Sequence, residues 1–340
     1  MDNWIKKKIG FAEETLLTRE LLEAYQLDKI IRTLRLAKEN SFFYTELLKD
    51  VNIEEFRSLS DIRKVPFTFV DDLRERGREM LCVPQSEISR IVTLDTSGTT
   101  GRPKRVYYTQ EDQELTIDFF HHGMMSLIDE NDGVLILLPC ARPGSVGDLL
   151  DMGIQRLGAK TVPYGLLNTD YSDIPDVLKD MCTKGVTSVV GSPTQVFELA
   201  NASIHLSMEI KSVLLSTEYV PETICNFLSR TWNCKVFEHY GMTEMGLGGA
   251  VSCWTLKGYH PREADLYFEI IDPTTGEVVP DGEFGEVVFT TLTRNGMPFI
   301  RYRTRDWSRW LTDQCPCGSI LKKLDKVRDR GIVKRNSVLL

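Results

Sequence analysis

Long hydrophobic runs are missing from this sequence. Its longest uninterrupted apolar stretch, Val134 to Leu138, has five residues, whereas a membrane-spanning helix needs about 20. Residues 1–17 contain lysines followed by acidic residues, where a secretory signal would have an apolar core. The sequence therefore predicts no membrane partner, and we expect a cytoplasmic location.

Cysteine is sparse, and basic residues do not predominate. Eight cysteines among 340 residues are too few for a fold held by disulfides. The 41 lysines and arginines are outnumbered by 49 acidic residues, which gives a net charge of −8. Because nucleic-acid binding requires a basic surface that neutralises phosphates, the composition argues against a nucleic-acid partner. The hydrophobic fraction of 42% is that of a globular protein.

We expect three successive parts along an α/β chain. In residues 1–89, apolar positions recur at helical spacing between residues 11 and 38, which predicts a helical segment that packs on the main domain. In residues 90–246, short β-branched runs alternate with amphipathic stretches, which predicts layered α/β sheets in a nucleotide-binding core. Residues 247–340 predict a smaller β-rich subdomain with a short basic tail. The core strands are expected at RIVTLD, GVLILLP, TSVVGSP, SVLLST and KVFEHYG.

The segment that says most about function is residues 96–104, which reads TSGTTGRPK. Its glycines let backbone N–H groups approach an anion, and its hydroxyls and basic side chains suit a triphosphate. Strand-like residues flank it, so we expect a hairpin, unlike the strand-to-helix turn of a Walker loop. A flexible surface loop of the same composition is an alternative that these residues alone leave open.

Three motifs, in the same order, resemble those of the adenylate-forming superfamily, which includes acyl-CoA synthetases and luciferases. Residues 96–104 resemble its phosphate-binding loop, residues 238–244 (EHYGMTE) its adenine and magnesium motif, and residues 301–306 (RYRTRD) its ribose motif. Within the superfamily, the chain is similar to the phenylacetate-CoA ligase branch. That similarity includes FFY at residues 42–44 and an arginine, Arg305, where most relatives have glycine.

The resemblance implies an ATP-dependent ligase that activates a small carboxylic acid to an acyl adenylate. It implies that Glu244 holds Mg²⁺, a hard ion that prefers oxygen ligands, and that Tyr240 stacks on adenine. Asp306 would accept the ribose hydroxyls. The implied catalytic residues are Lys104, Thr243 and Glu244, and the implied ATP/AMP-binding residues are Thr96, Ser97, Gly98, Thr99, Thr100, Gly101, Glu218, Tyr240, Gly241 and Asp306.

The turn before Glu218 departs from the resemblance. Ser216 and Thr217 occupy positions where relatives carry Gly-Gly or Gly-Ala. Because residues with side chains adopt positive φ less readily than glycine, we expect positive φ to be less accessible in this turn, which counts against its adenine contacts.

Four residues in the C-terminal third have the composition of a zinc site. Cys253 and His260 lie seven residues apart, and Cys315 and Cys317 follow as a Cys-x-Cys-Gly turn. Three thiolates and one imidazole are a usual tetrahedral zinc set, although unrelated reduced thiols fit the spacing equally well. The resemblance favours structural zinc, because some relatives in the branch carry a comparable set.

Full-length relatives continue for about another hundred residues as a separate C-terminal lid domain. We expect this lid to be absent, so that CoA thioester formation needs a separate lid-domain or acyl-acceptor protein. CoA stays one candidate for the acceptor of the acyl group. Three hypotheses follow: an acid-activating ligase, an acyl-protein synthetase that acylates a cysteine, and a nonenzymatic module that binds AMP or an acyl adenylate.

Overall fold

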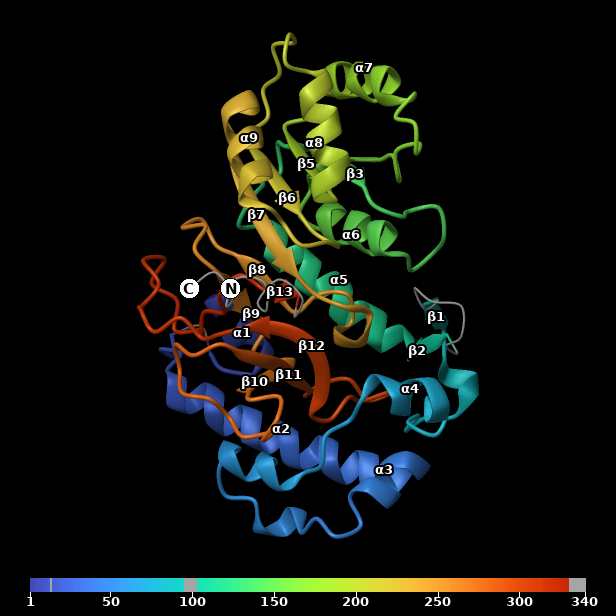
Figure 1. Ribbon diagram of the computed structural model, residues 1–340, viewed down its shortest axis with the longest axis vertical. Coiled ribbons are helices and arrows are strands. Elements are labelled where there is room, and N and C mark those ends of the chain that lie inside the picture. Colours follow the sequence, from blue (N-terminus) through green and yellow to red (C-terminus); the bar gives the residue numbers. More distant parts are fainter. Residues whose placement is uncertain (13, 95–102, 330–340) are drawn as a thin grey trace. The chain divides into compact units, whose positions relative to one another are not determined.

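The computed structural model describes residues 1–12, 14–94 and 103–329 (Figure 1). The described residues form two compact units. The first unit takes in residues 1–112, 243–245 and the described chain from residue 260 onward, and the second takes in residues 113–242 and 246–259. The division falls within helix α5 (Gln110–Met124) and strand β9 (Tyr259–Pro261).

A seven-stranded sheet with the order β4-β3-β5-β6-β7-β8-β9 organises the second unit. Strands β4, β3, β5, β6 and β7 pair in parallel, and β8 pairs with β7 antiparallel. The central strands are apolar and buried along their length because helices cover a parallel sheet on its faces. Besides β9, the strands are β3 (Gly133–Leu137), β4 (Lys160–Pro163), β5 (Ser188–Gly191), β6 (Ser212–Leu215), β7 (Lys235–Tyr240) and β8 (Ala250–Ser252).

Amphipathic helices bury one face against this sheet. Figure 1 shows α8 beside β5 and α9 beside β7. Their apolar faces join the strands in one core that includes Val189, Leu199 and Leu228, all of them fully buried. Besides α5, the helices of this unit are α6 (Val146–Gln155), α7 (Ile174–Lys184), α8 (Pro193–Ala202) and α9 (Glu222–Trp232).

The first unit contains a four-stranded antiparallel sheet and a separate hairpin. The sheet has the order β10-β11-β12-β13, with β10 at Leu266–Ile271, β11 at Gly285–Thr291, β12 at Tyr302–Ser308 and β13 at Arg328–Asp329. The hairpin joins β1 (Arg90–Leu94) to β2 (Lys104–Tyr108). The helices are α1 (Asp2–Lys8), α2 (Arg19–Asn40), α3 (Phe42–Leu47) and α4 (Val70–Arg76), and 3-10 turns occupy Ile53–Glu55, Leu59–Lys64, Gln85–Glu87 and Thr243–Met245.

The predicted α/β fold class is confirmed, and each of the five predicted core runs contains a strand. The helix expected from residue 11 begins only at Arg19, because the Thr18 hydroxyl caps its first turn by accepting a hydrogen bond from the Leu21 N–H at 3.4 Å. The short strands β4 and β8 were not predicted. The division of the chain at residues 89 and 246 concerns successive segments and stays a prediction.

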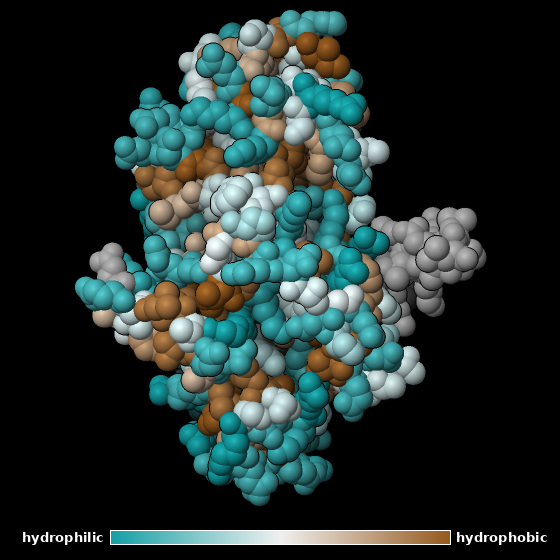
Figure 2. Space-filling model, turned by 90° about the vertical axis from the view of Figure 1, so that its left-hand side faces the viewer, coloured by the Kyte–Doolittle hydropathy of each residue, from teal (hydrophilic) through white to brown (hydrophobic). Residues whose placement is uncertain are grey.

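No helix in the described part of the chain is long and apolar enough to cross a membrane. On the face shown in Figure 2, hydrophilic residues predominate and hydrophobic ones lie in separate patches.

Candidate active site

The buried carboxylate of Glu244 is the centre of the candidate site in the first unit. Glu244 is 0% exposed, and its Oε1 accepts hydrogen bonds from Lys104 Nζ at 2.7 Å and from the Tyr302 hydroxyl at 2.9 Å. Within the described residues, nothing hydrogen-bonds to Oε2. Burying a carboxylate oxygen without a hydrogen-bond partner costs free energy unless a cation or a donor reaches it. The carboxylate therefore fits a role as a metal ligand.

Three separate elements bring these groups together. Lys104 opens strand β2, Tyr302 opens strand β12, and Glu244 lies in the 3-10 turn Thr243–Met245. Burial, together with the Glu244 carboxylate, raises the pKa of Tyr302 well above its usual value. The phenol therefore stays protonated and donates to Glu244, while Lys104 supplies the compensating charge.

Arg294 holds the turn that carries Glu244. Its Nη1 donates to the Glu244 carbonyl oxygen at 3.1 Å and its Nη2 to the Tyr107 carbonyl oxygen at 2.6 Å. Its guanidinium also lies 4.4 Å from the ring centre of Tyr108, whose hydroxyl donates to the carbonyl of Thr243. Sequence reasoning missed Arg294 and Tyr108. The sequence did point to Tyr302, because this residue lies inside the ribose motif.

Asp306 lies in a bulge of strand β12. Val288 pairs with Arg303 and Glu286 pairs with Trp307, so three residues of β12, 304–306, face one residue of β11. The Thr304 hydroxyl fixes the bulge by donating to the Val287 carbonyl oxygen at 2.7 Å.

Inside this bulge Arg305 has φ +68°. A positive φ is easy for glycine, the residue that the resemblance leads us to expect here, and strained for arginine. The Glu286 carboxylate stabilises this conformation by accepting a hydrogen bond from the Arg305 N–H at 3.0 Å.

The hairpin predicted around residues 96–104 is confirmed by the antiparallel pairing of β1 and β2, in which Leu94 pairs with Lys104. The predicted phosphate-binding residues Thr96, Ser97, Gly98, Thr99, Thr100 and Gly101 lie outside the described residues. Lys104 is the described member of this motif.

The predicted adenine-binding residues lie in the second unit. Tyr240 is the last residue of β7 and is buried. Gly241 follows it where a Cβ would lie 2.4 Å from the Leu247 carbonyl oxygen, so only glycine fits. The Oε2 of Glu218 accepts from the Thr194 hydroxyl at 3.3 Å. Contrary to the expectation for its turn, Thr217 adopts φ +74°, so the backbone keeps the left-handed conformation without glycine.

An apolar pocket lies within the second unit. Phe119, Phe120 and seven aliphatic side chains line it, and its polar side chains are those of Ser216 and His239. These two are hydrogen-bonded to each other, with 2.8 Å between Ser216 Oγ and His239 Nδ1. The ring of His239 packs beside both phenylalanines. The lining of the pocket therefore suits an apolar group that has one polar end.

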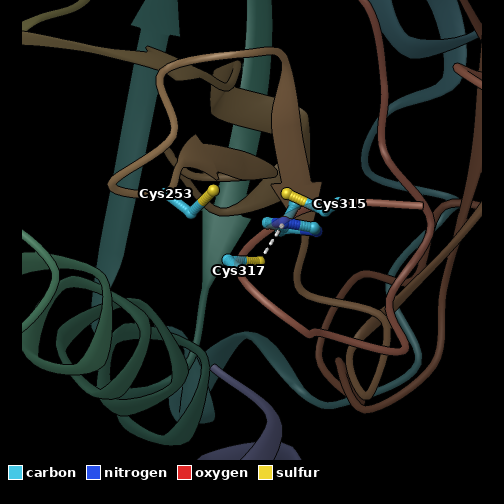
Figure 3. Close-up of side chains that lie close together, drawn as sticks. Cys253, Cys315 and Cys317 are labelled. Carbon is cyan, nitrogen blue, oxygen red and sulfur yellow. Dashed lines mark hydrogen bonds between the residues drawn. The ribbon is translucent and has the colours of Figure 1, made fainter. Parts of the chain in front are cut away.

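The four predicted zinc ligands lie together. The ligand atoms of Cys253, His260, Cys315 and Cys317, here called the Cys/His cluster, all lie within 4.8 Å of one another (Figure 3). His260 Nδ1 lies 3.2 Å from the Lys322 carbonyl oxygen. Because a carbonyl oxygen only accepts, Nδ1 carries the proton. In a neutral ring, Nε2 then has the lone pair that binds a metal, and it faces the Cys317 sulfur at 3.3 Å.

Comparison with known proteins gives the family of the chain. The AMP-binding enzyme family matches residues 53–293. Phenylacetate-coenzyme A ligases of Aromatoleum evansii and Escherichia coli (strain K12) are each 29% identical to the chain, over 92% and 91% of it and 71% of each relative. The crystal structure of a 2-hydroxyisobutyryl-CoA ligase with 2-HIB-AMP and CoA has a TM-score of 0.83 at 24% identity, covering 92% of this chain and 69% of that one.

The AMP-binding match covers more than half of the chain and includes two of the three motifs on which the sequence-based assignment rests, those at residues 96–104 and 238–244. The predicted resemblance is confirmed. The chain is an enzyme that belongs to the AMP-binding family, in its phenylacetate-coenzyme A ligase-like branch.

Proposed function

We propose that this enzyme uses ATP to activate a small, largely apolar carboxylic acid. A carboxylate oxygen of the acid attacks the α-phosphorus of ATP, and the phosphorus–oxygen bond to pyrophosphate breaks as the acyl adenylate forms. The observation that carries the proposal is the buried Glu244, with Lys104 and Tyr302 on one oxygen and no partner on the other among the described residues.

Charge placement supports this chemistry. Phosphoryl transfer is accelerated by positive charge that is already in position around the reacting phosphates. Lys104 supplies one such charge, and Thr243 would offer its hydroxyl to the α-phosphate. Mg²⁺ bound by Glu244 would neutralise phosphate oxygens, and Tyr302 would keep the carboxylate oriented.

We assign the remaining nucleotide contacts as the family motifs suggest. Tyr240 stacks on adenine, Gly241 and Glu218 contact the same base, and Asp306 accepts the ribose hydroxyls. Residues 96–101 supply further phosphate contacts. The close packing at Gly241 and the bulge at Asp306 support these roles, because each is a special local constraint on the backbone at a motif position.

The apolar pocket of the second unit supports an acid with an apolar body. Its aromatic and aliphatic lining suits a small aryl or branched alkyl acid. We propose CoA as the acyl acceptor, because the curated relatives are named as coenzyme A ligases. A separate lid-domain or acyl-acceptor protein stays a prediction.

Exchange of labelled pyrophosphate into ATP tests the function. A panel should include phenylacetate, benzoate, 2-hydroxyisobutyrate and hexanoate, each with Mg²⁺. We expect exchange that depends on at least one acid and stops when Mg²⁺ is chelated. Absence of exchange with every acid, combined with normal AMP binding, would favour the nonenzymatic binding module.

Asp306→Ala should weaken AMP binding about tenfold to hundredfold, because charge-assisted hydrogen bonds to the ribose are lost. Calorimetry measures the affinity. The matched control is Asp50→Ala, which removes an exposed carboxylate elsewhere in the first unit. Unchanged affinity in Asp306→Ala would disprove the ribose assignment.

We further propose that the Cys/His cluster binds structural zinc. Three thiolates and one imidazole complete a tetrahedral shell and leave no position for water or substrate, which is typical of structural sites. The hydrogen bond of His260 to the Lys322 carbonyl supports this role, because zinc-binding histidines are commonly oriented in this way.

Cys317→Ser should lose bound metal and lower the melting temperature, since metal binding to a folded site adds to folding free energy. Elemental analysis of untagged protein should find about one zinc ion per chain in the wild type. The control, Cys182→Ser, changes an exposed cysteine outside the cluster and should keep the metal. A wild-type content below about one-tenth of a zinc ion per chain would indicate that these cysteines are unrelated reduced thiols.

A further inference from the structure

Arg301 adopts a backbone conformation that residues with side chains rarely occupy. Its φ is +45°, in the left-handed region that favours glycine. Tyr302, the residue that follows, opens strand β12 and donates its hydroxyl hydrogen to Glu244 Oε1 at 2.9 Å. Because Arg301 is the last residue before the strand, its backbone angles set the direction in which Tyr302 enters the site.

The side chain of Arg301 is buried and held from two sides. Its Nε and Nη2 donate to the two carboxylate oxygens of Glu269 at 3.0 and 2.9 Å. Its Nη1 donates to the carbonyl oxygens of Arg63 at 3.1 Å and Val65 at 2.8 Å. The guanidinium also lies 4.0 Å from the ring centre of Phe67. With so many contacts, the guanidinium fixes the backbone that carries it.

Thr68 holds the main chain on both sides of Tyr302. Its N–H donates to the Arg301 carbonyl oxygen at 3.1 Å, and its carbonyl oxygen accepts from the Arg303 N–H at 3.0 Å. Its hydroxyl donates to the Ile300 carbonyl oxygen at 2.7 Å. Thr68 is fully buried, so these bonds are protected from water. The position of Tyr302 is therefore determined by the residues before and after it.

A role in stability alone does not account for the strained backbone. Arg303 and Glu286 form an ion pair in the same sheet, and neither residue has a positive φ. An arginine of this sheet can thus reach a carboxylate from ordinary strand backbone. Strained residues are kept where the surrounding structure holds them and where their conformation serves a site. At Arg301, the strained residue directly precedes a ligand of the Glu244 carboxylate.

We propose that Arg301 is a positioning residue for the metal site and acts through Tyr302. Its side chain holds the left-handed conformation, and this conformation directs the Tyr302 hydroxyl to Oε1 of Glu244. The carboxylate is thereby oriented with Oε2, which has no partner among the described residues, available to a metal ion. This inference rests on the proposed function, because it takes Glu244 as a ligand of Mg²⁺.

The test removes the ion pair without leaving a buried charge. Glu269→Leu combined with Arg301→Met should fold, because both charges are removed together. We expect its affinity for the Mn²⁺ complex of α,β-methylene-ATP, measured by calorimetry, to fall about 10–100-fold, the usual effect of losing a group that orients a metal ligand. Its affinity for the same nucleotide in EDTA should change little. The control, Arg35→Met with Glu54→Leu, removes an exposed ion pair of the same unit and should bind both forms normally.

A third substitution shows whether Arg301 acts through Tyr302. Tyr302→Phe alone should weaken binding of the Mn²⁺ complex by a similar factor. Adding it to the double variant should cause no further loss, because both changes remove the same contact. A crystal structure of the double variant gives a readout that needs no metal. In it the Tyr302 hydroxyl should lie beyond hydrogen-bond reach of the Glu244 carboxylate, more than about 3.5 Å away.

Other results overturn the proposal. Normal affinity for the Mn²⁺ complex in the folded double variant, or a retained Tyr302–Glu244 hydrogen bond, would limit the ion pair to stability. A full additional loss on adding Tyr302→Phe would show that Arg301 acts independently of Tyr302. If the double variant does not fold, Arg301→Lys replaces it, because lysine keeps the charge beside Glu269 but lacks the forked donors. Normal affinity in Arg301→Lys would then refute the proposal.

Failure of the proposed activation gives a different result. These binding measurements use no acid, so a wild type without acid-dependent exchange overturns the activation and leaves the role of Arg301 standing. Equal wild-type affinity for α,β-methylene-ATP with Mn²⁺ and in EDTA would overturn the metal role of Glu244, and this inference with it.

Discussion

Replacement of Glu244 by glutamine is expected to lower the rate of acid-dependent pyrophosphate exchange by about 10²–10³-fold, the usual effect of losing one preorganised charged contact at a reacting phosphate. The glutamine oxygen can still accept from Tyr302, so the side chain keeps its place. What is lost is the charge that pairs with Lys104 at 2.7 Å and that would bind Mg²⁺.

Two measurements separate this effect from a general loss of structure. The thermal midpoint of Glu244→Gln should stay close to that of the wild type, and the Mg²⁺ concentration for half-maximal exchange should rise. The control Glu87→Gln changes an exposed carboxylate of the same unit and should exchange normally. Wild-type exchange with an unchanged Mg²⁺ requirement in Glu244→Gln would contradict the assignment.

Glu269→Leu should lower the free energy of unfolding by about 3–5 kcal/mol, because it leaves the buried charge of Arg301 without its partner. Both residues are 3% exposed. The pair is bidentate, with Arg301 Nε at 3.0 Å and Nη2 at 2.9 Å from the two carboxylate oxygens. Burial raises the pKa of Glu269, and the charge of Arg301 opposes that rise.

Urea denaturation measures the loss in free energy of unfolding. A double variant tests whether the unpaired charge of Arg301 causes that loss. Glu269→Leu combined with Arg301→Met removes both charges and should recover most of the stability, although the donor bonds of Arg301 to the Val65 and Arg63 carbonyls are lost as well. The exposed pair Arg35–Glu54 is the comparison, and Glu54→Leu should leave the midpoint nearly unchanged. An equally small change in Glu269→Leu would refute the argument.

The sequence predicted those parts of the fold in which local pattern and burial agree. Strands β3, β5 and β6 are continuous apolar runs, as buried parallel strands usually are, and the sequence located each of them. Strand β4 has four residues, two of them exposed, and ends in Pro163. Its sequence carries neither a long apolar run nor a clear alternation, so it was missed.

The candidate site shows the same limit at the level of single side chains. Glu244 and Asp306 lie in motifs whose spacing is local, so the resemblance to the family named both as candidates. Arg294 acts on Tyr107, 187 positions earlier, and such a contact has no signature in residue spacing. The Cys/His cluster is intermediate, because the ligand types were evident from the sequence but their proximity depended on the fold.

The two-sided use of strand β2 has a consequence for how this enzyme can diversify. Lys104 and Tyr108 contact Glu244 and the turn that carries it, whereas Arg105, at an intervening position, is exposed. Substitutions at Arg105 can therefore change the exposed face of the strand while the chemistry at Lys104 is inherited unchanged. Insertion or deletion of one residue would exchange the two faces and take the Lys104 ammonium away from the Glu244 carboxylate, so selection should tolerate substitutions on the exposed face and reject changes in the length of the strand.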